Sequence, residues 1–254
     1  MKYLFLLGLF LLFWSYCIEP NILTIKKFQF DYEPLKGKRF VFATDLHIKP
    51  YEKKRLIKLV KKINSQKPNY VFLGGDYVNG HKKGNTLPIT DIAKELKNID
   101  APTFGVIGNH DGWQGKEEII QAMQANDIKI LVNENVKVEN FYIAGLDDMQ
   151  TGKPDVEKTL ANAYAPLIVL THSPDMFPSL PEHVTLTLAG HVHGGQIVFP
   201  FMKPFIVPSK YGKKYAYGMI KENNNVMFIS KGLGTSILPL RFNCAPEIVV
   251  IDFT

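Results

Sequence analysis

Five short apolar segments, each followed at once by Asp, Asn or His, constrain this chain more than any other feature. The segments and the residues that follow them are Phe40–Ala43 with Asp45 and His47, Tyr70–Leu73 with Asp76, Phe104–Ile107 with Asn109, His110 and Asp111, Leu167–Leu170 with His172, and Leu186–Ala189 with His191 and His193. Short apolar runs bounded by turn residues predict buried strands. Because ligands bind at the carboxyl ends of strands in α/β sheets, we expect these polar side chains to share one rim.

Amphipathic segments lie between the strands and predict helices. From Lys53 to Ile63, lysines alternate with apolar residues at helical spacing, so the lysines form a solvated face. Further helices are predicted at Ile89–Leu96 and Glu117–Ala125, and further strands at Tyr215–Lys221, Val226–Ser230 and Glu247–Phe253, with a hairpin turn at Asn223–Asn225. Strands that alternate with helices predict an α/β fold in which the strands are buried between helices.

The N-terminal segment differs from the rest of the chain. Residues 3–18 are apolar or aromatic except for Gly8 and Ser15, although a full membrane span takes about 20 residues. No small-x-small cleavage pattern follows them, and Tyr16 is a poor residue to precede a lipidated Cys17. We interpret residues 1–20 as an uncleaved anchor, with a removed signal peptide or a segment lying at the interface as alternatives. Residues 21–38 are then a connector, and residues 39–254 form one domain.

The charge distribution indicates a membrane surface as a partner. The 254-residue chain carries a formal charge of +6, and basic residues follow the apolar segment directly. They are Lys26, Lys27, Lys36, Lys38 and Arg39. Basic residues on this flank tend to stay cytoplasmic and to meet anionic headgroups, which predicts the cytoplasmic face of the inner membrane. No aromatic residues interleave with the lysines of the 53–63 helix, so no nucleic-acid partner is expected.

The polar residues at the strand ends suit a metal site. Carboxylate, amide oxygen and imidazole together favour Mn, Fe or Zn, whereas oxygen ligands alone favour Mg or Ca. In an extended segment, Asp-x-His and His-x-His place both side chains on one side, so each pair can chelate. Any one of these patterns is also common in ordinary surface or core pairs, but their joint occurrence favours a site. The set is too large for one tetrahedral ion, and it suits two ions about 3.5–4 Å apart that share a carboxylate and a hydroxide.

The motifs, taken in order, resemble those of the calcineurin-like metallophosphoesterase superfamily. They are Asp-Leu-His at 45–47, Gly-Gly-Asp at 74–76, Gly-Asn-His-Asp at 108–111, Thr-His-Ser-Pro-Asp at 171–175 and Ala-Gly-His-Val-His-Gly-Gly-Gln at 189–196. The resemblance runs from about Arg39 to the end of the chain, and none of the blocks is degenerate. It implies a β-sandwich core flanked by helices, so that residues 39–254 are a catalytic domain behind an N-terminal apolar anchor.

The resemblance also implies a role for each motif residue. Asp45, His47 and His193 would hold a first metal, Asp76 would bridge, and Asn109, His172 and His191 would complete the second metal site. His110 would bind the phosphate and protonate the leaving oxygen, and Asp111 would orient His110. The implied cofactors are two divalent cations, with Mn preferred and Fe or Zn as alternatives. The implied reaction is attack of a bridging hydroxide on phosphorus.

Within the superfamily, the chain is most similar to a membrane-associated branch with relatives that hydrolyse UDP-2,3-diacylglucosamine in lipid A biosynthesis. A glycolipid nucleotide substrate would explain the anchor. The segment Phe199–Pro208 is interpreted as an acyl-binding or membrane-dipping lip, or else as a packed loop, and Arg241 as a diphosphate contact or a partner of Glu247. A general phosphodiesterase for soluble or nucleotide substrates is the alternative function. A non-catalytic scaffold is disfavoured because no ligand is missing.

Four polar residues lie outside the motifs. His81 and His183 are interpreted as solvated loop residues. Asp147 and Asp148 follow the apolar run Phe141–Leu146, where they either line the cleft or belong to a simple turn.

Overall fold

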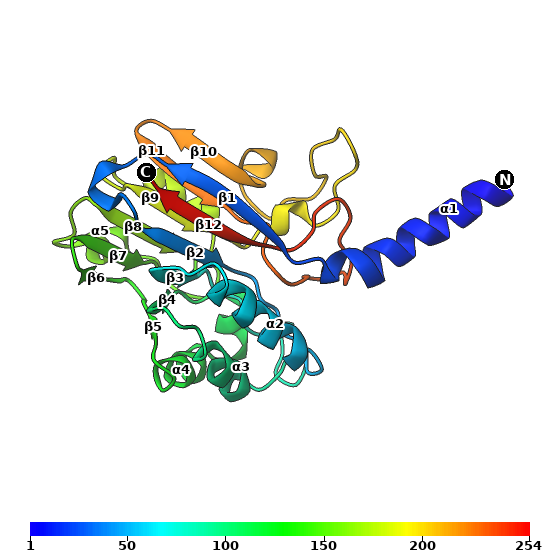
Figure 1. The fold of residues 1–254 in the computed structure, drawn as a ribbon, viewed down its shortest axis with the longest axis horizontal. Coiled ribbons are helices and arrows are strands. Elements are labelled where there is room, and N and C mark those ends of the chain that lie inside the picture. The colour runs from blue at the N-terminus through cyan, green and yellow to red at the C-terminus, as the bar shows by residue number, and fades with distance from the viewer.

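Two six-stranded sheets pack face to face in the computed structural model, which describes residues 1–254 (Figure 1). In spatial order, the first sheet contains β1 (Thr24–Phe30), β12 (Glu247–Phe253), β2 (Arg39–Ala43), β3 (Tyr70–Leu73), β4 (Thr103–Gly105) and β5 (Ile128–Ile130). The second contains β10 (Gly218–Glu222), β11 (Asn225–Ile229), β9 (Leu186–Ala189), β8 (Leu167–Thr171), β7 (Phe141–Gly145) and β6 (Glu134–Val138). The α/β fold with a sandwich core is therefore confirmed.

The central strands of both sheets are parallel, which explains why their sequences are continuously apolar. Strands β2 to β5 run parallel in the first sheet, and β7, β8, β9 and β11 do so in the second. Parallel strands are covered on both faces and cannot show an alternating pattern. Between the sheets, the core contains packed aromatic rings such as Phe40, Phe72 and Phe141.

Three helices cover the outer face of the first sheet: α2 (Lys53–Asn64), α3 (Ile89–Leu96) and α4 (Asn109–Gln124) (Figure 1). Helix α2 buries Leu56, Leu59, Val60 and Ile63 against this sheet, as an amphipathic helix does. The outer face of the second sheet packs against α5 (Val156–Leu160) and irregular segments that contribute Phe177 and Tyr215.

Element boundaries differ most from the prediction at three places. Helix α4 begins at Asn109 rather than Glu117, because its first turns are polar and Gly115, at φ 131°, interrupts the apolar repeat. Strand β10 begins at Gly218 rather than Tyr215, whose side chain lies in the core from a 3₁₀ turn. Residues 24–30 of the expected connector form β1, which pairs in parallel with β12 from Thr24 opposite Glu247.

The N-terminal segment projects from one end of the sandwich (Figure 1). Helix α1 (Lys2–Phe13) has no buried residue and continues through a π-helical turn, Trp14–Ile18, into a 3₁₀ turn, Glu19–Asn21. Residues Lys2–Asn21 are the one helical stretch long and apolar enough to cross a membrane, a test that signal sequences also pass.

Candidate metal centre

The carboxyl ends of the central strands from both sheets meet at one buried site. Strands β2 and β3 lead into Asp45, His47 and Asp76, and β4 leads into Asn109 at the start of α4. Strand β8 leads into His172, and β9 leads into His191 and His193. All seven predicted ligands are buried. A cluster of buried ionisable groups needs compensating partners, because an unpaired buried charge is costly.

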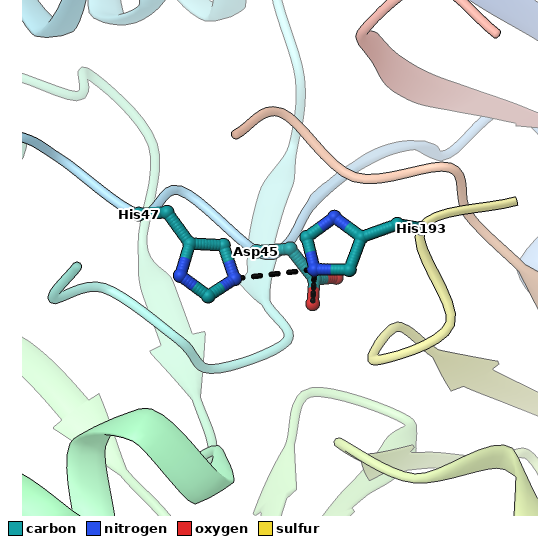
Figure 2. Close-up of side chains that lie close together, drawn as sticks. All are labelled: Asp45, His47 and His193. Atoms are coloured by element: carbon teal, nitrogen blue, oxygen red, sulfur yellow. Dashed lines mark hydrogen bonds and ion pairs between the residues drawn. The ribbon is translucent and has the colours of Figure 1, made fainter. Parts of the chain in front are cut away.

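One group of donors consists of Asp45, His47 and His193 (Figure 2). The Nε2 atoms of His47 and His193 are 3.2 Å apart, and the His193 Nε2 atom lies 3.5 Å from Asp45 Oδ1. The donor atoms of all three residues lie within 4.8 Å of one another. Asp45 is held in place by the Thr44 hydroxyl, which donates to its Oδ2 at 2.8 Å.

A second group consists of Asn109, His172 and His191. The Oδ1 atom of Asn109 lies 2.9 Å from His172 Nε2 and 3.0 Å from His191 Nδ1. These two ring nitrogens are 3.2 Å apart. The Nδ1 atom of His172 donates to the Gly74 carbonyl at 2.8 Å, which directs Nε2 into the group. Histidines that bind metals are commonly oriented by such a backbone contact on the other ring nitrogen.

Asp76 lies between the two groups. Its Oδ2 atom is 3.4 Å from Nε2 of His47 in the first group and 3.3 Å from Nε2 of His172 in the second. Its Oδ1 atom accepts the backbone N–H of His110 at 2.8 Å. One carboxylate oxygen therefore faces donors of both groups.

The electrostatics of the site fit cations. Burial lowers the pKa of His47 and of His193 well below the usual value, so both rings present neutral lone pairs. Burial also acts to lower the pKa of His172, but the Asp76 charge outweighs it and the pKa is raised well above its usual value. The pKa of Asp76 is lowered, because the charge of His172 outweighs its burial. A proton on His172 thus balances Asp76 where a bound cation would supply the same charge.

Most of the ligand residues have an unusual backbone. Left-handed φ angles occur at Asp45 (54°), His47 (42°), Asp76 (56°), His191 (70°) and His193 (51°). Such conformations cost about 1–3 kcal/mol each for non-glycine residues and cluster at functional sites. Asp-x-His and His-x-His were predicted to chelate from extended segments. In the structure, residues of left-handed φ carry these side chains instead, and only Asp45 and His47 face the same donor group, whereas His191 and His193 face different ones.

Two glycines permit the close approach of these turns. A Cβ atom on Gly108 would collide with Asp76 Oδ1, and one on Gly190 would collide with Asp45 Oδ2 and the Thr44 hydroxyl. The glycines of the motifs therefore make room for the ligands themselves.

His110 and Asp111 lie beside the metal donors but do not contact each other as predicted. A ring nitrogen of His110 is within 4.8 Å of donor atoms of His47 and Asp76, while His110 Nδ1 lies 2.9 Å from the Gly80 carbonyl. The Asp111 carboxylate instead accepts backbone N–H groups of Asp76, Tyr77, Val78 and Gly108 at 2.7–3.3 Å. Burial and the Asp76 charge raise the pKa of Asp111 to about 8, against the effect of these donors. Gly80 rather than Asp111 orients His110, and Asp111 holds the turn that carries Asp76.

Three side chains near the site were missed by the sequence interpretation. The rings of exposed His81 and Trp113 pack against His110, with centroids 4.9 and 5.0 Å from its ring. The Gln150 amide nitrogen lies 3.2 Å from His191 Nε2. Gln150 is in a turn that Asp148 closes by accepting its backbone N–H at 2.9 Å. The contacts of His81 and Gln150 join segments distant in sequence, so no local pattern signals them, whereas Trp113 lies one turn after His110 on α4, a helical spacing that could have indicated its contact.

Arg241 does not pair with Glu247, which was one of the two interpretations of its role. It is fully buried, and its guanidinium donates to the carbonyls of Lys231, Gly234 and Cys244. Glu247 accepts from Ser230, Tyr217 and the backbone of Lys231 instead.

Two cavities open onto the site. One, of about 470 Å³, has Asn109, His110 and His193 at its base and apolar walls that include Ile197, Phe205 and Ile237. The other, of about 1310 Å³, extends from His47 and His110 to Tyr16 and Cys17 in the N-terminal segment, past Lys49 and Lys82.

A two-sheet sandwich whose strand ends gather carboxylate, imidazole and amide donors is the arrangement of a metallophosphoesterase. Residues 38–195 match the family model described as calcineurin-like phosphoesterase. The chain therefore belongs to the calcineurin-like phosphoesterases.

Relatives from several bacteria support this assignment. The chain is 34% identical over 235 residues to metallophosphoesterase YkuE of Bacillus subtilis, covering 84% of this chain and 78% of that protein. It is 30% identical to phosphodiesterase YaeI of Escherichia coli K12, covering 84% and 81%. A metallophosphoesterase of Helicobacter pylori J99 is 30% identical, and the match spans only 60% of that longer protein. The crystal structure of TT1561 from Thermus thermophilus has the same fold, with a TM-score of 0.51 at 12% identity over 78% of this chain and 91% of that one.

Proposed function

We propose that this protein hydrolyses a phosphodiester or pyrophosphate with two divalent cations. Asp45, His47 and His193 would hold one cation, and Asn109, His172 and His191 the other, with Asp76 shared. The observation that carries this proposal is the Asp76 Oδ2 atom, 3.4 and 3.3 Å from Nε2 of His47 and His172. The mixed oxygen and nitrogen donors suit Mn, with Fe or Zn as alternatives.

The bound cations would supply Lewis-acid charge for the phosphoryl oxygens and a water nucleophile of lowered pKa. The protein residues then have separate tasks. Asp76 fixes the spacing of the two sites. His110 is the proton donor to the leaving oxygen, because its Nδ1 is held by the Gly80 carbonyl and its Nε2 is the nitrogen left to exchange a proton. Asp111 keeps Asp76 in its left-handed turn through four backbone hydrogen bonds.

The surroundings of the site favour an amphiphilic substrate at a membrane. Beside the smaller cavity, the loop at 199–206 and the segment at 237–238 expose large apolar side chains. They are Phe199, Phe201, Met202, Phe205, Ile206, Ile237 and Leu238, called here the apolar lip. Exposed apolar patches of this kind mark membrane or ligand contacts. A membrane-held pyrophosphate such as UDP-2,3-diacylglucosamine would place its acyl chains on the lip and its diphosphate at the cations, with α1 as an anchor at the cytoplasmic face.

A general phosphodiesterase for soluble or nucleotide esters is the second candidate. It is favoured by the name phosphodiesterase given to the Escherichia coli relative and by the open, lysine-lined cavity that also reaches His47 and His110. In that case the N-terminal helix would only fix the enzyme's location.

The test compares two substrates with detergent-solubilised protein and Mn²⁺. Release of UMP from UDP-2,3-diacylglucosamine by wild type, but not by Asp76→Ala, supports the lipid substrate. Cleavage of bis-p-nitrophenyl phosphate alone retains the metal chemistry and rejects that substrate. In Asp76→Ala we expect loss of activity together with loss of bound metal, and retention of two metals per chain would refute the bridging assignment.

A further inference from the structure

The base of the N-terminal helix is docked on the domain, in contrast to α1 itself. Ser15 and Glu19 are 8% and 5% exposed, whereas no residue of α1 is buried. The Trp14 indole N–H donates to Glu19 Oε2 at 2.9 Å. A buried carboxylate is costly unless hydrogen-bonded, so this arrangement implies specific partners on the domain.

Those partners are the two ends of one turn. The backbone N–H of Arg241 donates to the Ser15 carbonyl at 2.9 Å. The backbone N–H of Cys244 donates to Glu19 Oε1 at 2.5 Å. The helix base therefore holds the turn Arg241–Cys244 at both of its ends.

The same turn supports the metal centre. Within it, Arg241 projects its buried guanidinium so that a terminal nitrogen lies 3.5 Å from His193 Nδ1, and the Cys244 thiol lies 3.3 Å from the His193 carbonyl. Arg241 also donates to the Gly234 carbonyl at 2.9 Å, and the Gly234 N–H donates to the Asp45 carbonyl at 2.6 Å. One contact path thus joins Glu19 to two residues of the first donor group.

We propose that Ser15–Glu19 is a positioning element of the metal centre: by clamping the turn Arg241–Cys244 it fixes His193 and Asp45 for cation binding. The N-terminal segment is then a structural part of the catalytic domain in addition to its proposed role as a membrane anchor. This inference concerns cation affinity and does not depend on which phosphoester is the substrate.

The chain provides a closely matched control for Glu19. Glu33 also begins a 3₁₀ turn, is also followed by proline, and pairs only with Lys36 on the surface, where its side chain is 77% exposed. Glu19→Ala and Glu33→Ala therefore remove the same group from equivalent local structures. Trp14→Phe is a milder variant, because it keeps an aromatic side chain at this position, leaves Glu19 in place and removes the indole donor to Glu19.

The experiment measures Mn²⁺ binding to chelator-treated full-length protein in detergent, by calorimetry, together with the unfolding temperature before Mn²⁺ is added. We expect Glu19→Ala to bind Mn²⁺ about tenfold more weakly than wild type, the lower range for a residue that supports metal ligands. The Mn²⁺ affinity of Trp14→Phe should lie between those of wild type and Glu19→Ala. Glu19→Gln should recover part of the lost affinity, because its amide oxygen still accepts from the Cys244 N–H. Glu33→Ala should bind Mn²⁺ as wild type does.

Wild-type Mn²⁺ affinity in Glu19→Ala would overturn the proposal; should that variant not fold, the same result in Trp14→Phe decides. If the unfolding temperature falls while the affinity is unchanged, the contact is purely structural.

Discussion

Single side chains in the site gain their properties from one another. Buried His47 and His193 have lowered pKa values and remain neutral, while Asp76 raises the pKa of His172. Imidazole side chains are thus neutral and offer a lone pair on one side of the site, at His47 and His193, whereas His172 on the other side is protonated. Burial and the nearest charge decide between these states, and both sides are complementary to positive charge.

His110 is the residue whose removal separates binding from chemistry. In His110→Ala we expect both metals to remain, because seven other side chains supply the donors, while turnover falls by roughly 10²- to 10⁴-fold with loss of a general acid. Steady-state rates on bis-p-nitrophenyl phosphate and metal content by atomic absorption check this. His183→Ala, at an exposed loop position, is the control and should be unaffected. Full activity in His110→Ala would remove this histidine from the mechanism.

The substitution Gly190→Ala tests whether the turns that carry the ligands leave room for an added Cβ atom. Its added Cβ would meet Asp45 Oδ2 and Thr44 Oγ1, so Gly190→Ala should displace the Asp45 carboxylate and weaken metal binding at least tenfold, as loss of ligand support does. Gly8→Ala, where nothing lies within 4 Å of the added atom, should bind metal normally. Equal Mn²⁺ affinities in calorimetry would show that the turn can relax.

At the scale of elements, continuous apolar runs predicted most of the buried strands, whereas three of the four edge strands, β1, β5 and β6, were not predicted. Strands β3, β9 and β12 and helix α3 match the predicted bounds. Strand β1 was missed because it is an edge strand in which exposed Lys26 and Lys27 interrupt the pattern. The candidate ligands could be grouped from the sequence because each follows a strand within a recognisable motif. His81 and Gln150 could not, because only the folded loops bring them to His110 and His191, while Trp113 lies one turn after His110 on α4.

The apolar lip is an element whose role depends on the substrate. Phe201 and Ile237 are its most exposed members, at 109% and 93%. If acyl chains lie on it, Phe201→Asp combined with Ile237→Asp should raise KM for an acylated substrate about tenfold or more, since burial of apolar groups contributes on the order of 1.5–3 kcal/mol per large side chain. Cleavage of bis-p-nitrophenyl phosphate should be unchanged. Tyr164→Asp, at an exposed residue outside the lip that follows α5 in the chain, serves as the control, and an equal effect there would contradict a specific lip.

At the scale of the whole molecule, the site requires that the two sheets keep a fixed position relative to each other. Its donors come from both, so any sliding of one sheet on the other would separate Asp76 from His172. Beyond the aromatic core, a polar tie connects the sheets at the amino end of β3, opposite the site. Glu139, in the turn between β6 and β7, accepts the Tyr70 hydroxyl at 2.6 Å and the Lys38 ammonium at 2.5 Å.

Tyr70→Phe removes one half of this tie without changing the packed ring. We expect the free energy of unfolding to fall by about 1 kcal/mol at neutral pH, as for loss of one hydrogen bond.

Burial and the Glu139 carboxylate raise the pKa of Tyr70 to about 12, above about 10 in the unfolded chain. The wild-type advantage over Tyr70→Phe is therefore complete below pH of about 10 and is lost as the pH rises to about 12, where tyrosinate would face carboxylate. Urea unfolding of both proteins in detergent across this range measures the difference. Tyr142→Phe, at a partly exposed position of β7, removes a hydroxyl outside this tie and should not change the free energy of unfolding. A constant difference between wild type and Tyr70→Phe at every pH would show that the hydroxyl does not titrate within the tie.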